Sequence, residues 1–241
     1  MLEKKITVAS FDVFPNSTMK PSALQQYMQQ LAREDCDAMG YTYMMMREVN
    51  MVFVLTKLGL KMNKPVFAYD ELMVKTYQNR VSGITWEREF EFYRDGEEVI
   101  HATTQWVVVK YDTRQIVRPR DFPGDIVSAE LECNTISLPR AFDTAELDFV
   151  GDRVVRLSDL DENDHLNNCV YSAISLDALP FDRKANFVSE LYIIFRQEAK
   201  LGDVLRLSAA EKETGFVVSA YNSTADRPCF DALCALGKIS G

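Results

Sequence analysis

Residues 158–171 concentrate more polar chemistry than any other part of this 241-residue chain. The segment reads SDLDENDHLNNCVY, and within it Asp161, Asn163 and His165 occupy every second position. A carboxylate and an imidazole can activate water by acid–base chemistry, and an imidazole exchanges its proton near neutral pH. An amide side chain can orient water or a substrate by hydrogen bonding. These three residues are therefore the first candidates for a catalytic site.

The flanking elements explain how this polar segment would be positioned. It follows a strand-like stretch at residues 153–157 and precedes an apolar helical stretch that begins near Val170. Asn167 or Asn168 would cap that helix, and Pro180 lies just beyond its end. The segment is thus predicted to be a loop that brings polar side chains to a helix start, where backbone N–H groups could meet developing negative charge.

The motif resembles the active-site motif of the acyl-acyl-carrier-protein thioesterases, which release fatty acids from the carrier protein by hydrolysing a thioester. The matching residues are Asp161, Asn163, His165, Asn167, Asn168 and Tyr171. Residues 196–199, RQEA, resemble the family's second signature, an arginine followed closely by a glutamate and, in many members, a cysteine. Ala199 stands at the cysteine position, which argues against a cysteine nucleophile and leaves Glu198 as the acid carried over.

Thioester hydrolysis needs an activated water, a stabilised carbonyl oxygen and a thiolate that can leave. The resemblance implies that Asp161 and Glu198 orient or deprotonate water, that Asn163 orients water or substrate, and that His165 binds substrate or carries a proton. Whether Asp161 or Glu198 activates the water stays open at this point. Direct attack by Asp161, which would give a mixed anhydride, is a further alternative.

The two halves of the chain repeat one order of elements. Apolar periodicity in the first half predicts a strand at 5–13, a helix at 22–39, and strands at 51–60, 71–77, 84–93 and 99–111. The second half predicts a strand at 153–157, the polar loop, a helix, and strands at 189–195, 204–210, 216–221 and 229–235. One strand, one helix and several antiparallel strands describe a hotdog domain.

The predicted fold class is therefore α+β, with two tandem hotdog domains, each an antiparallel sheet wrapped around a central helix. Residues 1–120 would form the N-terminal hotdog, with the acyl-chain pocket and a degenerate site. Residues 121–148 contain prolines and short polar runs, which indicate a linker, and 149–241 would form the catalytic C-terminal hotdog.

An internal alignment supports this duplication. An offset of 147 residues, that between Asn16 and Asn163, also aligns Asp12 with Asp159 and Met19 with Leu166. The same offset places Phe14 at the position of Asp161 and Thr18 at that of His165. The first copy is thus expected to keep the loop and to lack its chemistry.

Composition restricts the remaining function classes. A net charge of −9 and a pI near 4.9 argue against broad nucleic-acid binding, which needs an extended basic face. No apolar run is long enough to span a membrane, and no apolar signal core follows the N-terminal lysines, so a cytoplasmic protein without a membrane partner is expected. Five scattered cysteines and two histidines predict neither a disulfide framework nor a metal site, and no cofactor is expected.

The resemblance implies that the partner is an acyl carrier protein that carries a fatty acyl chain. Because that carrier is itself acidic, a local basic patch is expected, and two groups are candidates: Arg114, Arg118 and Arg120, or Arg183 with Lys184. Two fused hotdog domains could act as a monomer or pair into a homodimer.

Met44, Met45 and Met46 could line an acyl tunnel, although ordinary packing is the simpler interpretation. His101 lies in a β-rich run, where no acidic partner close in sequence is expected for it, and it is expected to be structural.

Three alternatives stay open. Hotdog acyl-CoA thioesterases share the aspartate, the histidine and the NNxxY sequence, but Asn163 and Asp164 stand where they more often have an aromatic residue and a glycine. A hotdog hydratase would need the same groups placed for addition of water to a double bond. A non-catalytic acyl-thioester-binding module is favoured by one feature, the lost cysteine at Ala199. Acyl chain length is not predictable here, because it depends on a tunnel that the family leads us to expect mainly in the first half.

Overall fold

The computed structural model describes residues 1–125, 129, 135–180, 182 and 184–239. Within this part, the strands are β1 (Leu2–Thr7), β2 (Met51–Met62), β3 (Glu71–Ser82), β4 (Thr85–Arg94), β5 (Glu97–Lys110), β6 (Ile116–Val117), β7 (Asp148–Val154), β8 (Asn186–Phe195), β9 (Val204–Lys212), β10 (Gly215–Asn222) and β11 (Arg227–Lys238). The helices are α1 (Pro21–Ala38), α2 (Tyr43–Glu48) and α3 (Asn168–Asp177), with short 3₁₀ turns η1 (Pro119–Asp121) and η2 (Leu157–Asp159).

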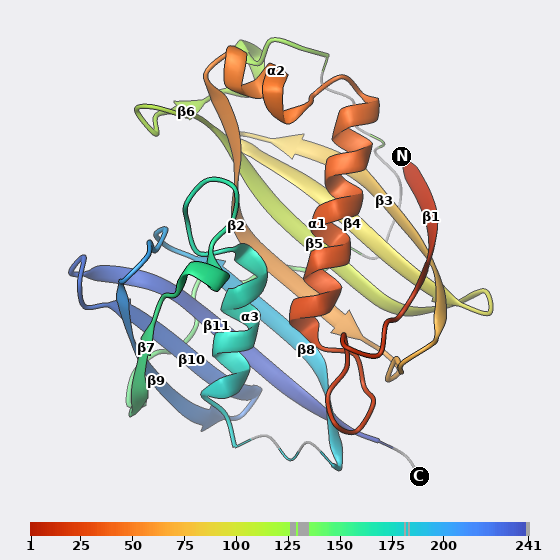
Figure 1. The fold of residues 1–241 in the computed structure, drawn as a ribbon, viewed down its shortest axis with the longest axis vertical. Helices are drawn as coiled ribbons and strands as arrows, with labels where there is room; N and C mark the ends of the chain where they lie inside the picture. Colours follow the sequence, from red (N-terminus) through yellow and green to blue (C-terminus); the bar gives the residue numbers. More distant parts are fainter. Residues whose placement is uncertain (126–128, 130–134, 181, 183, 240–241) are drawn as a thin grey trace.

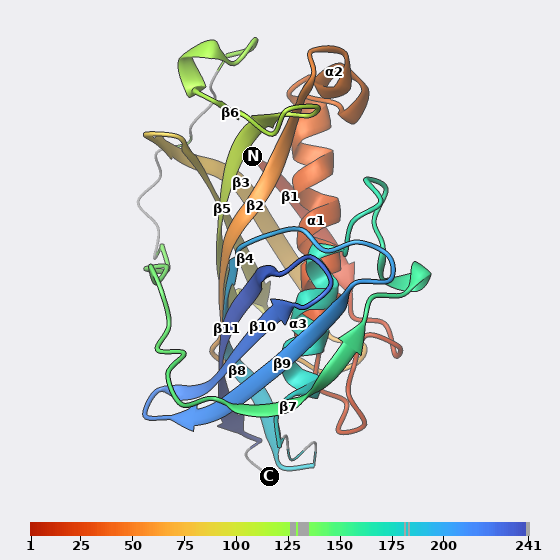
Figure 2. The same ribbon diagram turned by 90° about the vertical axis from the view of Figure 1, so that its left-hand side faces the viewer.

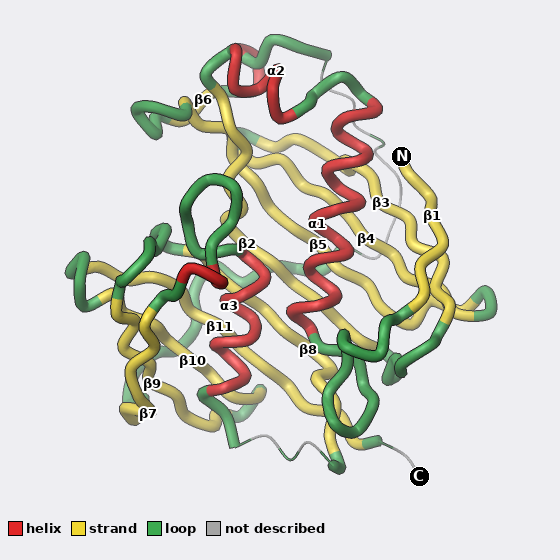
Figure 3. The backbone as a smooth tube through the Cα atoms, in the orientation of Figure 1, coloured by secondary structure: helices red, strands yellow, loops and turns green. Residues whose placement is uncertain are grey.

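All the described strands join one antiparallel sheet in the order β1-β3-β4-β5-β2-β8-β11-β10-β9-β7, and β6 pairs with β5 (Figures 1 and 3). The two halves of the chain meet where β2 pairs with β8, from the Lys57–Ile194 pair to the Lys61–Glu190 pair. Helices α1 and α3 contact each other and lie on the same face of the sheet (Figure 1). The architecture confirms the predicted fold class, an α+β fold of two hotdog units that each wrap a sheet around a helix.

Helix α1 lies against the sheet through the apolar line predicted from its sequence. Pro21 occupies its first turn, where the missing N–H costs no hydrogen bond, and Leu24, Met28 and Leu31 are buried. Asp35 lies on the same line and is also buried, because its carboxylate accepts a hydrogen bond of 2.7 Å from the Arg88 guanidinium of β4. A charge in this core is therefore compensated by a charge from the sheet.

Helix α3 begins as its capping sequence predicts. The side chain of Asn167 accepts a 3.0 Å hydrogen bond from the backbone N–H of Cys169, and the helix ends before Pro180. Tyr171 and Ile174 face the main core between helix and sheet. Capping and packing together orient the helix start toward the preceding polar loop.

Most of the predicted strands have somewhat different bounds in the structure, and two of them were predicted to run past a point where the chain leaves the sheet. The first ends at Thr7 instead of residue 13, and β7 covers Asp148–Val154 instead of residues 153–157. In both places the chain turns away from the sheet, since the N–H of Asp12 donates to the carbonyl of Ala9 and that of Asp159 to Arg156. Local turn hydrogen bonds thus override β-propensity at these sites. Helix α2, which the sequence did not reveal, begins at a Thr42 cap that accepts from Met45 N–H.

The loops that precede α1 and α3 repeat the same backbone path at the predicted offset of 147 residues. Phe14 N–H donates to Thr18 O at 2.8 Å, and Asp161 N–H donates to His165 O at 2.8 Å. Further matching features are the bonds from Lys20 N to Asp12 O and from Asn167 N to Asp159 O, both 2.9 Å, and the positive φ angles of Ser17 (63°) and Asp164 (62°). The duplication is therefore visible in hydrogen bonds as well as in sequence.

Residues 135–147, the described part of the linker that leads to β7, lie on the face of the sheet opposite the helices (Figure 2). The N–H of Ile136 donates to Thr103 Oγ1 at 3.0 Å. Leu138 and Ile136 pack so closely over Gly59 that a Cβ at this position would lie 2.5 Å from Leu138 Cδ2. Glycine in β2 therefore allows the linker to pack directly on the sheet.

His101 is buried between two carboxylates on this linker-covered face. Its Nε2 lies 3.0 Å from Glu89 Oε2, and its Nδ1 lies 3.1 Å from Glu98 Oε1. The structural interpretation of His101 fits this position, but the expectation that it lacks an acidic neighbour in sequence was wrong, since Glu98 is three residues away. Burial alone lowers the pKa of His101, but the hydrogen bonds and charges of the two glutamates outweigh it and raise the pKa.

Candidate active site

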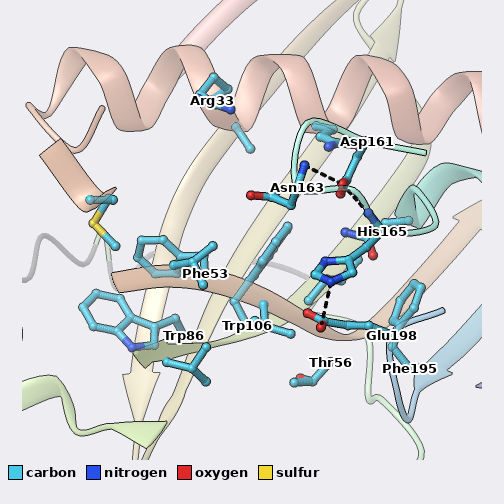
Figure 4. Close-up of a pocket in the computed structure, with 18 of the residues that line it drawn as sticks. Arg33, Phe53, Thr56, Trp86, Trp106, Asp161, Asn163, His165, Phe195 and Glu198 are labelled. Atoms are coloured by element: carbon cyan, nitrogen blue, oxygen red, sulfur yellow. Dashed lines mark hydrogen bonds and ion pairs between the residues drawn. The ribbon is translucent and has the colours of Figure 1, made fainter. Parts of the chain in front are cut away.

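Asp161 organises the loop that carries the candidate residues (Figure 4). Its Oδ1 accepts hydrogen bonds from the backbone N–H of Asn163 at 2.8 Å and from that of His165 at 3.3 Å. Asp164, at the tip, adopts the left-handed φ of 62° that aspartate tolerates better than most residues. The carboxylate thereby sets the directions in which the Asn163 and His165 side chains leave the loop.

The base of the loop is anchored by Asp159, which the sequence indicated as a loop residue. Its carboxylate accepts two hydrogen bonds from Arg153, at 2.9 and 2.8 Å, and one from the N–H of Arg156 at 2.7 Å. Both Arg153 bonds come from Nη2, and charge-assisted hydrogen bonds of this kind are stronger than neutral ones. Asp159 therefore supports the site without facing it.

Glu198 reaches His165 from the segment that follows β8. Leu166 N–H donates to Ala199 O at 2.8 Å, and Arg227 donates to Glu198 O at 3.0 Å, which holds this segment beside the loop. Glu198 Oε2 then lies 3.4 Å from His165 Nε2 (Figure 4). The His165 side chain is 14% exposed and that of Glu198 is 37% exposed, so the pair is reachable from solvent.

Two residues of the first half also contact the site: Tyr43, which the sequence did not indicate, and Arg114, which the sequence indicated only as a candidate for carrier docking. Tyr43 donates its hydroxyl to Asn163 Oδ1 at 3.4 Å, and Arg114 Nη2 lies 3.1 Å from Glu198 Oε2. Their positions in the chain are far from the motif, and no local pattern connects them to it. They were found only because the sheet brings the halves together.

A cavity of about 490 Å³ extends from these polar groups into the first half. Asp161, Asn163, His165 and Glu198 all line it (Figure 4). Its other lining residues include Met46, Phe53, Leu55, Trp86, Trp106 and Phe195. Trp86 packs against Phe53 with ring centroids 5.6 Å apart. The cavity is thus polar at the loop and largely apolar and aromatic within the first half, a shape suited to an apolar chain with a reactive end.

Comparison with known proteins identifies the family. Residues 1–127 match the profile of the acyl-ACP thioesterase N-terminal domain, and residues 145–236 match that of the acyl-ACP thioesterase C-terminal domain. The chain belongs to the acyl-ACP thioesterase family. The two matches together cover most of the sequence, which agrees with the resemblance of its motifs.

Individual relatives share low sequence identity with this chain. The chain is 25% identical over 246 residues to oleoyl-acyl carrier protein thioesterase 2, chloroplastic, of Arabidopsis thaliana. The alignment covers 92% of this chain and 66% of that protein. The chain thus spans just under two thirds of that relative's length. Among solved structures, an acyl-ACP thioesterase from Bacteroides thetaiotaomicron has a TM-score of 0.81 at 18% identity, covering 98% of this chain and 97% of that one. The 12:0-ACP thioesterase from Umbellularia californica has a TM-score of 0.82 at 16% identity, covering 99% and 97%.

In this family member the position of the signature cysteine is fully buried. Ala199 has an exposed fraction of 0% and packs in the main core. Cys133 lies outside the described residues, and the other four cysteines are free. Burial raises the pKa of the cavity-lining Cys36 thiol, and burial raises that of Cys169 to about 12. None of the described cysteines therefore presents a thiolate to the site at neutral pH.

The candidate methionines, and likewise the candidate basic residues, lie in different environments in the structure. Met46 lines the cavity, whereas Met44 is 66% exposed. Of the first basic group, Arg114 is engaged with Glu198, while Arg118 and Arg120 are exposed near η1. Of the second group, Arg183 lies outside the described residues.

Among the described residues, no cluster of three histidine, cysteine, aspartate or glutamate side chains is arranged to hold a metal ion. The described helices also include none that is long and apolar enough to cross a membrane.

Proposed function

We propose that this chain hydrolyses the thioester of fatty acyl-acyl carrier protein and releases free fatty acid and carrier protein. The observation that carries the proposal is the position of the His165–Glu198 pair in a cavity of about 490 Å³ whose lining in the first half is largely apolar and aromatic. An acyl chain in the cavity would leave its thioester beside these groups. Membership of the acyl-ACP thioesterase family supports the same reaction.

The proposed catalytic residues are Asp161, Asn163, His165 and Glu198. Glu198, paired with His165, would take a proton from a water that adds to the thioester carbonyl carbon. The resulting oxyanion would be met by the Asn163 amide and the N-terminus of α3. Its collapse would break the carbon–sulfur bond, and the proton taken up by Glu198 would pass through His165 to the departing thiolate. Asp161 Oδ1 already accepts two backbone hydrogen bonds, which favours an orienting role for this residue over direct attack.

The division of labour between the halves is also a proposal. Residues 1–120 would form the acyl-chain pocket, 121–148 the linker, and 149–241 the catalytic hotdog. The cavity lining supports this, since five of its aromatic side chains come from the first half (Tyr41, Tyr43, Phe53, Trp86 and Trp106) and two from the second (Tyr171 and Phe195).

We further propose a cytoplasmic enzyme, monomeric or homodimeric, whose partner is the acyl carrier protein. The four free thiols among the described residues suit a reducing compartment. Arg118 and Arg120, exposed near η1, are the remaining described members of the first candidate docking group.

The deciding experiment measures thiol release from acyl thioesters of graded length, each offered on acyl carrier protein and on coenzyme A. The wild type should prefer the carrier protein, and His165→Ala should lower kcat by about 10² to 10⁴ if the imidazole transfers the proton. Asp164→Asn, an exposed change in the same loop that keeps a residue tolerant of positive φ, serves as the control. Preference for coenzyme A would favour an acyl-CoA thioesterase, and stable binding without release would indicate a binding module.

A further inference from the structure

The first half places two polar side chains against the catalytic groups of the second half. Arg114 contacts Glu198, and Tyr43 contacts Asn163, at the distances given above. Both side chains line the same cavity as their partners. Each contact therefore joins a candidate catalytic group of the second half to a residue of the first half.

Arg114 is held in place by its own surroundings. It lies in the turn between β5 and β6 with a left-handed φ of 57°, and its N–H donates to Lys110 O at 2.9 Å. Its guanidinium lies 5.6 Å from the centroid of the Tyr111 ring. The N–H of Tyr111 in turn donates to Asn50 O at 3.0 Å, so the turn is tied to the start of β2. The guanidinium thus belongs to a turn with a defined geometry.

Glu198 needs such a partner. Its side chain is more than one third exposed and has three rotatable bonds, so that an unpaired carboxylate would sample several rotamers. The single oxygen Oε2 contacts both Arg114 Nη2 and His165 Nε2. The guanidinium therefore favours the rotamer in which the carboxylate meets the imidazole.

Tyr43 acts on Asn163 in a comparable way. With the phenol hydroxyl donating to Oδ1, the Nδ2 group of Asn163 is left to donate elsewhere. Because Asn163 lines the cavity, this orientation makes the amide N–H₂ available to a carbonyl oxygen of a substrate.

We propose that Arg114 and Tyr43 are positioning residues of the first half, which hold Glu198 against His165 and orient Asn163. This inference rests on the proposed function for its catalytic meaning. It assigns to the first half a part in the reaction as well as in binding the acyl chain.

The kinetic test compares Arg114→Met, Arg114→Lys and Lys5→Gln, a control that removes an exposed charge of the first half away from the cavity. Arg114→Met should lower kcat by up to about 10²-fold with KM changed less than about twofold, since misplaced catalytic groups slow the chemical step. Arg114→Lys should recover part of the rate, and Lys5→Gln should match the wild type. A rise in KM without loss of kcat would overturn the proposal and assign Arg114 to carrier docking.

A double-mutant cycle tests whether Arg114 acts through Glu198. In a Glu198→Gln background, Arg114→Met should cause little further loss, because the group it positions is already disabled. The same reasoning applies to Tyr43→Phe in an Asn163→Ala background. Full additivity in either cycle would overturn the corresponding assignment.

A measurement independent of turnover separates this proposal from the proposed function. The chain has only two histidines, so the ring NMR signals of His165 can be assigned by comparison with His165→Ala. Arg114→Met should shift the ring signals of His165 and leave those of His101 unchanged. Unchanged His165 signals would overturn the proposal even if the wild type is an active thioesterase. Shifted signals in a protein that releases no thiol would support the positioning role and reject the proposed reaction.

Discussion

Glu198 is held at the cavity by contacts of both its side chain and its backbone. One of its oxygens contacts both a guanidinium and an imidazole, and its backbone carbonyl accepts a further bond from Arg227. The adjacent residue, Ala199, points the other way, into the core. Two consecutive residues thus have separate tasks, one at the cavity and one in the packing.

This separation leads to a prediction for Ala199→Cys. Because position 199 is fully buried, the added sulfur should be enclosed by the core and inaccessible to the substrate. We expect kcat within about twofold of the wild type and a loss of stability of roughly 1 kcal/mol from overpacking. Thiol-release assays and urea unfolding would measure both. A large gain in rate would show that a thiol at this position takes part in the reaction.

Among the secondary-structure elements, helix α3 connects the polar loop to the core through its capped N-terminus. Asn167→Ala removes the hydrogen bond from Cys169 N–H to the cap and should lower the free energy of unfolding by about 1 kcal/mol. Urea unfolding of this variant beside Asn168→Ala, which lies one position beyond the cap, would check the value. Equal losses in the two variants would contradict the capping assignment.

The linker-covered face provides a pH prediction. The folded pKa of His101 is raised above its ordinary value of 6.5, so its protonated form stabilises the native state most below pH about 6.5. This contribution is lost as the pH rises through the raised folded value. The other charged residues beside His101 are Lys61 and Glu91, its partners on the adjacent strands β2 and β4. They add to the carboxylates of Glu89 and Glu98, which contact the imidazole directly.

The measurement is the difference in unfolding free energy between wild type and His101→Gln from pH 5 to pH 9. The wild-type advantage should be largest at the acidic end and should shrink with rising pH. A difference that grows with pH would show that His101 is neutral in the folded protein.

The elements differ in how far their sequence predicts them. Helix α1 and the strands β2 to β5 followed from apolar periodicity, and the α3 cap followed from Asn167, because these signals are local. The ends of β1 and β7 were wrong because turn hydrogen bonds at Asp12 and Asp159 compete with β-propensity. In the site, motif residues were recognisable by type and spacing, whereas the contacts of Tyr43 and Arg114 depend on pairing between distant strands.

In the molecule as a whole, the continuous sheet brings cavity-lining side chains of the first half beside the polar loop of the second half. Trp86 lies in the first half, on the opposite side of the close-up from Glu198 (Figure 4). It is buried against Phe53 and Phe122, with centroids 5.6 and 5.0 Å away. The indole therefore fills volume that a longer acyl chain could occupy.

We expect Trp86→Ala to shift the preferred substrate toward longer acyl chains, since the truncation enlarges an apolar cavity. The graded panel of acyl-carrier-protein thioesters would measure the length profile, and Trp106→Phe, a smaller reduction in the same cavity, provides a comparison. An unchanged profile in a folded Trp86→Ala protein would exclude the indole as a length determinant.

The duplicated loops also determine how many acyl groups one chain can process. In the first copy, Asn16 donates to Asn186 O and accepts from Thr18, so its amide ties the halves together. Phe14 and Thr18 replace the acid and the histidine. Where two identical loops would allow two acyl groups per fold, the described chain carries one equipped loop. Binding of a non-hydrolysable acyl-thioester analogue should therefore saturate at one molecule per polypeptide, and a single damaged loop leaves no second copy to sustain turnover.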